Sequence, residues 1–138
     1  MRVREIMSTP VIGVTADATI EEAAALMMDK GFTTLPVFSG SGRLIGLITE
    51  ADLGGARYTP GPRRAPEPED GVLVGIAIRL VKQVMRAPAL AIPADADLTD
   101  LATAMVEAHQ RCIPVVDRQL VVGMVSWRDL LARLDRES

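Results

Sequence analysis

The chain has 138 residues, of which 49% are hydrophobic and only 3% aromatic, and its formal net charge is −3. This length and apolar fraction predict one compact unit, or two very small ones, and they exclude a disordered tail. The acidic pI of about 5.1 and the shortage of aromatic side chains argue against nucleic-acid binding.

The sequence also argues against membrane and secretory classes. Its most hydrophobic stretch, Gly71–Val84, is interrupted by Arg79, so no membrane span is expected. The N-terminal residues lack the apolar core of a secretory signal, and a single cysteine, Cys112, excludes an internal disulfide framework. We therefore predict a cytoplasmic protein.

Few residues suited to catalysis or metal binding are present. No Cys or His cluster has metal-ligand spacing, and His109 is the only histidine. His109 and Cys112 as a base and nucleophile would lack an orienting partner, so we expect Cys112 to be a small buried core residue. We predict no enzyme activity, no metal site and no catalytic cofactor.

An internal repeat dominates the sequence. Matched segments are displaced by 78 residues at first and, after one deletion, by 77. The copies run over residues 3–53 and 81–130. The matched pairs are Met7–Pro10 with Met85–Pro88, Leu35–Val37 with Ile113–Val115, and Gly46–Leu53 with Gly123–Leu130.

Hydrophobic spacing and capping residues predict the same elements in both copies. In the first copy they are a short helix over Val3–Met7, a strand over Val11–Val14, a helix behind Thr19, strands over Leu35–Phe38 and Leu44–Ile48, and a closing helix behind Thr49. In the second they are a short helix over Val81–Met85, a strand over Ala89–Ile92, a helix behind Asp97, strands over Ile113–Val116 and Leu120–Val125, and a closing helix behind Ser126. Thr19 with Glu22 fits a capping box, whereas Asp97 with Asp100 predicts a weaker cap.

The segment between the two copies does not follow the repeat pattern. Residues 55–70 are rich in Gly, Pro and Arg and predict a linker, with a lid that reaches a bound polyphosphate through Arg63 and Arg64 as the alternative. Helical spacing over Gly71–Val84 predicts a connecting helix, with a strand over Val72–Ile78 as the alternative. The predicted units are therefore a first repeat over 1–54, a linker over 55–70, and a helix with the second repeat over 71–138.

The predicted fold class is α/β (α+β), with a short mixed sheet and two packed helices in each repeat. A unit of about fifty residues buries too little surface to be stable alone. We therefore expect the two repeats to pack face to face as a pseudo-twofold pair with two equivalent clefts.

The repeated hydrophobic-Pro-Val step and the terminal Gly-x-hydrophobic-[Thr/Ser]-x-x-Asp motif resemble a tandem pair of CBS domains, often called a Bateman module. The resemblance covers both repeats and fails between about Gly54 and Leu80. It implies a regulatory module that binds AMP, ADP, ATP or S-adenosylmethionine between the repeats. Members of the family commonly pair into a disc, so the resemblance also implies a homodimer that signals in trans to an unknown protein effector.

The resemblance also implies roles for individual residues. Asp52 and Asp129 would accept ribose hydroxyls, Thr49 and Ser126 would contact phosphate, and the strands around Val14 and Ile92 would flank adenine. These types suit the chemistry, because a carboxylate accepts paired hydroxyls and a helix N-terminus holds an anion. Thr49-x-x-Asp52 and Ser126-x-x-Asp129 are also ordinary helix caps, and the same groups can do both.

We expect the two sites to differ. The position three residues before the Pro is Arg111 in the second repeat and Thr33 in the first, and Arg128 follows Ser126 where the first repeat has Glu50 and Ala51. The hypothesis is that the Ser126 and Asp129 cleft binds a phosphorylated adenosine more tightly. The alternative is a dimerisation or protein-interaction module with vestigial ligand sites.

Overall fold

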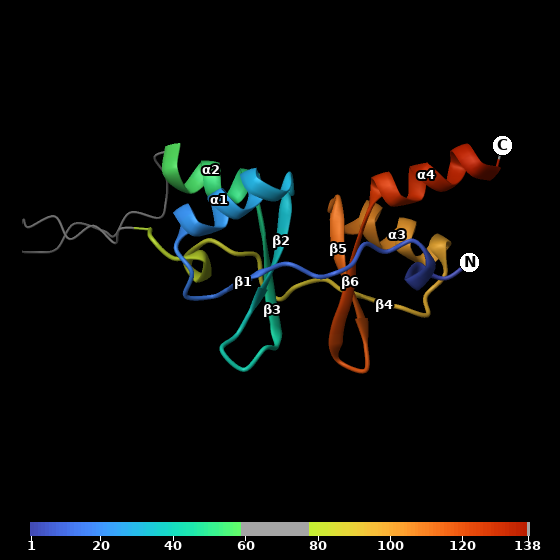
Figure 1. Cartoon of the computed structure of the whole chain (residues 1–138), viewed down its shortest axis with the longest axis horizontal. Helices are drawn as coiled ribbons and strands as arrows, with labels where there is room; N and C mark the ends of the chain where they lie inside the picture. The colour runs from blue at the N-terminus through green and yellow to red at the C-terminus, as the bar shows by residue number, and fades with distance from the viewer. Residues whose placement is uncertain (59–77, 138) are drawn as a thin grey trace, which may run out of the picture.

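The computed structural model describes residues 1–58 and 78–137, and it has an α+β fold with two halves side by side (Figure 1). In chain order, the first repeat contains the short 3₁₀ helix η1 (Val3–Glu5), β1 (Val14–Thr15), α1 (Ile20–Lys30), β2 (Thr34–Phe38), β3 (Leu44–Thr49) and α2 (Glu50–Tyr58). The second contains η2 (Val81–Gln83), β4 (Ile92–Pro93), α3 (Leu98–Ala108), β5 (Cys112–Asp117), β6 (Leu120–Ser126) and α4 (Trp127–Glu137).

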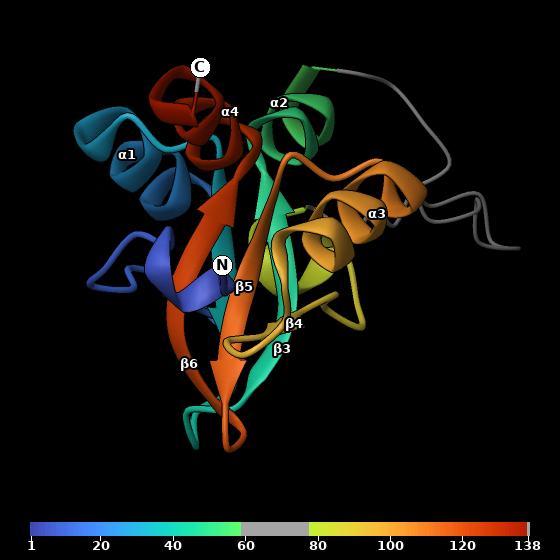
Figure 2. The same ribbon diagram turned by 90° about the vertical axis from the view of Figure 1, so that its right-hand side faces the viewer.

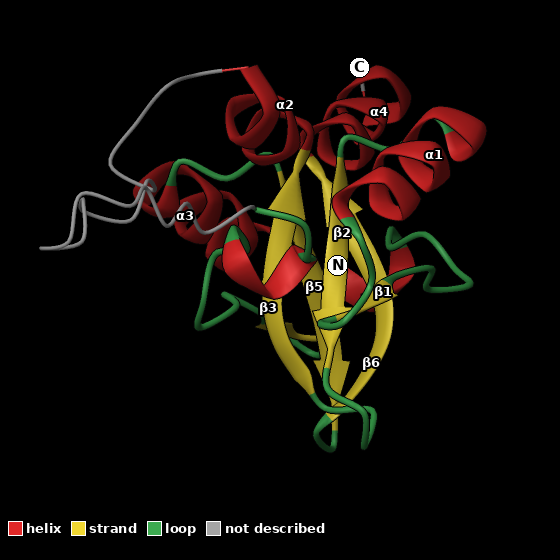
Figure 3. Ribbon diagram, turned by 90° about the vertical axis from the view of Figure 1, so that its left-hand side faces the viewer, coloured by secondary structure: helices red, strands yellow, loops and turns green. Residues whose placement is uncertain are grey.

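Each half is built on a mixed three-stranded sheet, in the order β1-β2-β3 or β4-β5-β6. The first two strands are parallel, and the last two form an antiparallel hairpin. The middle strands are covered on both faces, because Leu35–Val37 and Ile113–Val115 are completely buried runs. The two hairpins face each other, and α1, α2 and α4 gather at one end of the sheets (Figures 1 to 3).

The caps of the central helices confirm the difference read from the sequence. The Glu22 N–H donates to Thr19 Oγ1 at 3.0 Å, and the Glu22 carboxylate accepts from the Thr19 N–H at 3.3 Å. At α3 the Asp97 side chain accepts from the Asp100 N–H at 2.9 Å, without a reciprocal bond. The first helix therefore has the full capping box and the second only its N-cap half.

The two halves exchange their opening segments. The side chain of Val3 is buried in the second core, and its N–H donates to the Ala96 carbonyl at 2.9 Å. In return, Val81 is buried in the first core, and its N–H donates to the Ala18 carbonyl at 2.9 Å. In Figure 1 the blue N-terminus accordingly lies at the far side of the second half. Each core is thus incomplete without residues from the other repeat.

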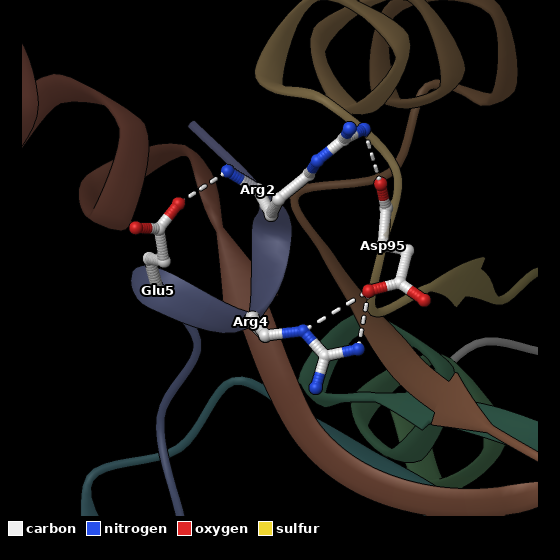
Figure 4. A network of polar contacts seen from close by, with 4 residues as sticks. All are labelled: Arg2, Arg4, Glu5 and Asp95. Carbon is white, nitrogen blue, oxygen red and sulfur yellow. Dashed lines mark hydrogen bonds and ion pairs between the residues drawn. The ribbon is translucent and has the colours of Figure 1, made fainter.

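Polar contacts support the same exchange. Arg4 pairs with the Asp95 carboxylate, and the Arg2 guanidinium donates to the Asp95 carbonyl at 2.8 Å (Figure 4). The matched contact in the first half is Lys82 Nζ with Asp17 Oδ1 at 2.9 Å. These exposed pairs contribute little energy each, but they repeat across the two halves and mark their pseudo-twofold relation.

Two glycines allow the exchanged segments to approach. A Cβ on Gly46 would lie 2.8 Å from the Arg86 carbonyl oxygen and 2.8 Å from Met85 Sδ. A Cβ on Gly123 would lie 2.5 Å from Met7 Sδ. Since real Cβ contacts are not this close, a side chain at Gly46 would push the opening segment away from the sheet, and one at Gly123 would force the Met7 side chain to move.

Several predicted boundaries are corrected. The predicted helix over Gly71–Val84 is wrong at Ile78–Leu80, because the Arg79 carbonyl accepts from the Ile20 N–H and Leu80 forms a bridge to Thr19. The predicted strands over Val11–Val14 and Ala89–Ile92 are two-residue strands that begin only at their last residues. Residues 55–58 of the predicted linker belong to α2.

The rest of the intervening segment falls outside the described residues. This applies to the predicted linker and lid from residue 59 onward, to residues 71–77 of the predicted connecting helix, and to nearly all of its strand alternative. None of the helices in the described ranges is long and apolar enough to cross a membrane.

Candidate functional site

Each closing helix is directly preceded by a hydroxyl residue that is bonded to the aspartate three positions later. In the first repeat the Thr49 N–H donates to Asp52 Oδ2 at 2.9 Å, and the Asp52 N–H donates to Thr49 Oγ1 at 3.2 Å. In the second the Ser126 N–H and hydroxyl both donate to Asp129 Oδ2, at 2.8 and 3.2 Å. Capping therefore holds both carboxylates at helix N-termini, where backbone N–H groups favour anions.

A cavity of about 600 Å³ opens beside Asp129, and we call it the second site. Its walls come from both repeats, because the exchanged N-terminal segment and the start of β2 face the closing helix of the second repeat. The lining residues include Ser8, Pro10, Ile12, Thr33 and Thr34 from the first repeat, and Arg111, Ser126, Arg128 and Asp129 from the second. A ligand here would touch both repeats at once.

A smaller cavity, of about 340 Å³, lies beside Thr49, and we call it the first site. It is lined by Thr33, Thr49 and Glu50 of the first repeat, and by Arg86 and Arg111 of the second. Asp52 is not part of this wall. Its side chain is only 12% exposed, and Arg86 Nε contacts both of its carboxylate oxygens, at 3.3 and 3.2 Å.

Thr33 and Arg111 both line both sites. Their carbonyl groups accept the first N–H of the closing helices, from Glu50 at 3.0 Å and from Trp127 at 3.2 Å. This position between the sites changes the electrostatic expectation. Each site is lined by two arginines, Arg86 with Arg111 or Arg111 with Arg128, so the contrast in positive charge expected from Thr33 and Glu50 is not present.

The structure does not bring every predicted residue into a cavity wall. Ile92 is 4% exposed in the second core, and Val14 packs against the first core. Neither lines the two sites, because β1 and β4 serve mainly as sheet edges. The apolar lining near the second site comes instead from residues such as Ile12 and Met124.

Cys112 lies at the sites and is not the fully buried core residue that the sequence analysis expected. It is half-buried and lines both cavities. Burial, with a smaller effect of the nearby Asp129 carboxylate, raises the pKa of its thiol to about 11. A thiol with this pKa remains protonated at neutral pH, so it offers no reactive thiolate.

Sequence reasoning missed Ser8 and Arg86 as site residues. They occupy matched positions in the two copies, each directly after a methionine, and the exchange carries each to the other repeat's site. The sequence did contain one signal that could have drawn attention to them: the two matched positions hold different residue types, a serine and an arginine. Their destination depends on the exchange, which motif spacing alone does not reveal.

Comparison with known protein families finds the CBS domain model twice in the chain, over residues 3–56 and 81–136. The protein YhcV of Bacillus subtilis, described as CBS domain-containing, is 30% identical over 128 residues, which are 93% of this chain and 81% of that protein. An uncharacterized protein of Methanocaldococcus jannaschii, MJ1404, is 28% identical over 130 residues. The match covers 94% of this chain but 31% of MJ1404, and the matches to three other curated relatives cover 26%, 24% and 12% of those proteins.

Among solved structures, the CBS domain pair of protein MJ0100 superposes with a TM-score of 0.81. The superposition covers 100% of this chain and 98% of that one at 22% sequence identity, so it establishes a shared fold. That structure is described as a complex with 5′-methylthioadenosine and S-adenosyl-L-methionine.

Proposed function

The chain belongs to the CBS domain family as a tandem pair, and on that premise we propose that it is a regulatory module binding an adenosine-containing ligand between its two repeats. The observation that carries this proposal is the second site. There a capped carboxylate and a helix N-terminus share a cavity with walls from both repeats. The adenosine ligands of the MJ0100 pair support the same ligand class.

Each polar group of the second site has a role in this proposal. Asp129 uses Oδ2 for both bonds from Ser126, which leaves Oδ1 without a bond from the described residues. Oδ1 would accept a ribose hydroxyl, while Ser126 and the N-terminus of α4 would hold a phosphate. Arg111 and Arg128 would add charge-assisted bonds to an anionic ligand such as AMP, ADP or ATP. S-adenosylmethionine would rely on the ribose contact without the phosphate contacts.

We further propose that the second site binds more tightly than the first. The reason is the state of the two aspartates rather than the number of arginines. Arg86 contacts both oxygens of Asp52, whereas within the described chain no basic side chain lies within ion-pair distance of Asp129. A ligand must therefore displace a cation to use Asp52, but not to use Asp129.

The signal would follow from the shared walls. A ligand that touches both repeats favours one relative arrangement of them, and such coupling typically amounts to about 1–3 kcal/mol. We propose that this change is read in trans, by a protein effector or within a homodimer. Exposed apolar side chains on α1 and α2, Met28 and Tyr58 at 84% each, support self-association. Sedimentation of Tyr58→Asp beside the unmodified protein tests this, and an unchanged mass argues against that surface.

Calorimetry with AMP, ATP and S-adenosylmethionine tests the proposed function. We expect Asp129→Asn to weaken the tighter binding event and Asp52→Asn to affect only a weaker one. Asp29→Asn is a charge-matched control, because Asp29 is exposed on α1 and lines neither site. Equal losses in the two site variants, or a loss only in Asp52→Asn, would contradict the proposed order.

A thermal-shift screen separates this function from the interaction-module alternative. A ligand specific for the folded chain stabilises it by about 2.7 kcal/mol at one hundred times its Kd. No shift with AMP, ADP, ATP or S-adenosylmethionine at millimolar concentration would favour a module with vestigial sites.

A further inference from the structure

Arg86 comes from the opening segment of the second repeat but lies in the first site. Its backbone pairs with Leu47 of β3, through N–H to carbonyl bonds of 2.9 and 2.8 Å in the two directions. Its side chain is 52% exposed and contacts both oxygens of Asp52 through Nε. The backbone pairing fixes where the side chain starts, while the exposed guanidinium is able to change partners.

The second site has a serine at the matched position. Ser8 pairs with Met124 of β6 through bonds of 2.7 and 3.1 Å, as Arg86 pairs with Leu47. Asp52 lies five residues after Leu47, and Asp129 lies five residues after Met124. Ser8 therefore occupies the same position relative to Asp129 as Arg86 occupies relative to Asp52. At this position the first site has a positively charged side chain and the second site has a neutral one.

We propose that Arg86 is a specificity-determining residue that makes the first site prefer 5′-phosphorylated adenosine over uncharged adenosine. The inference rests on the proposed function, because it assumes that Asp52 accepts ribose hydroxyls. An uncharged nucleoside that takes Asp52 leaves the guanidinium without its carboxylate partner. A nucleotide provides a phosphate in the same cavity, so Arg86 exchanges one anion for another.

The other charged groups of the first site fit this assignment. Arg111 lies in the same wall and would also favour an anionic ligand, while Glu50 opposes it. His109 lines the cavity as well and is exposed. The net positive lining places a phosphate near Thr49 and the N-terminus of α2, which itself favours anions.

The size of the effect follows from the kind of ion pair. Pairs between partly exposed side chains are worth about 0.2–1 kcal/mol, which corresponds to roughly 1.4- to 5-fold in affinity. Removing Arg86 should therefore strengthen adenosine binding by up to about fivefold and leave AMP binding nearly unchanged, because the lost phosphate contact is offset by the lost competition for Asp52. The AMP-to-adenosine affinity ratio would fall by up to about fivefold.

The experiment isolates the first site with Asp129→Asn and measures adenosine and AMP binding by calorimetry. In this background, three proteins are compared: one that keeps Arg86, one with Arg86→Ser and one with Arg86→Lys. Arg86→Ser introduces the residue found at the matched position 8, and Arg86→Lys keeps the positive charge. We expect Arg86→Ser to raise adenosine affinity and leave AMP affinity nearly unchanged, and Arg86→Lys to keep most of the AMP preference. A thermal melt of each variant checks its fold.

A reciprocal variant tests the matched position. Ser8→Arg, made with Asp52→Asn, should give the second site a higher AMP-to-adenosine ratio than Ser8 does. If both ligands weaken together in Arg86→Ser, or neither changes, Arg86 does not determine specificity. An unchanged ratio in Ser8→Arg contradicts the inference too. If the unmodified protein binds neither ligand at either site, the proposed function fails and this inference falls with it, whereas failure confined to the Arg86 comparison leaves that function standing.

Discussion

The exchange of opening segments predicts that a mutation near the N-terminus will destabilise the second repeat. Val3 is fully buried among residues of the second core, and Val81 is fully buried in the first. Val3→Ala should therefore loosen α3, β5 and β6, while Val81→Ala should loosen α1, β2 and β3. Neither result would be expected if each repeat formed its core from its own residues.

The magnitude follows from the two methyl groups removed. Burial of two such groups contributes about 1.6 kcal/mol, and the cavity left behind adds up to about 1 kcal/mol. Each variant should lose about 2–3 kcal/mol of unfolding free energy. For a chain of this length that corresponds to roughly 6–12 °C in Tm. Val106→Ala is the control, because Val106 is 60% exposed on α3 and its loss should cost less than about 0.5 kcal/mol.

Native-state hydrogen exchange, read by residue, shows where each variant opens. We expect Val3→Ala to speed exchange first in the second half and Val81→Ala first in the first half. If Val3→Ala instead speeds hydrogen exchange first in the sheet and helices of the first repeat, and Val81→Ala first in those of the second, the swapped placement of the opening segments is refuted. A loss of stability below about 0.5 kcal/mol in both variants would also contradict it, because it would mean that neither side chain is buried.

Three further predictions concern a cap, a thiol and a glycine. Thr19→Ala should cost about 1 kcal/mol in urea unfolding, and a cost near zero would show that the capping box does not form. Because burial raises the pKa of Cys112 to about 11, iodoacetamide should modify it slowly at pH 8 and faster as the pH approaches 11. Asp129→Asn should lower that pKa and speed the reaction, so an unchanged rate contradicts the charge effect. Gly46→Ala should separate Arg86 from β3 and reduce both stability and first-site binding, because the new Cβ would meet the Arg86 carbonyl oxygen. A variant as stable as the unmodified protein would show that the close approach is not required.

The order of elements follows directly from residue patterns. Apolar spacing and capping side chains act over three or four residues. Thr19, Thr49 and Ser126 therefore predict the starts of their helices from local sequence alone. Two in-register copies of one motif also identify the CBS family, which the family comparison confirms.

The partners of the opening segments could not be read from the same patterns. Val3 and Val81 need a buried surface, but their apolar character does not say which repeat supplies it. The duplicated sequence makes both choices look equivalent, and tertiary packing selects the exchanged one. This choice brings Arg86 to Asp52 and Ser8 to the second site, so the placement of these two residues is set by packing and not by the motifs.

The most direct test of ligand binding between the repeats is a titration with AMP followed by the backbone amide signals. The second site predicts concerted shifts at Ser126 and Asp129 of the second repeat and at Ser8 and Thr33 of the first. These signals should respond at lower AMP concentrations than Thr49 and Glu50 at the first site. Shifts confined to one repeat, or no shifts at millimolar AMP, would contradict the account.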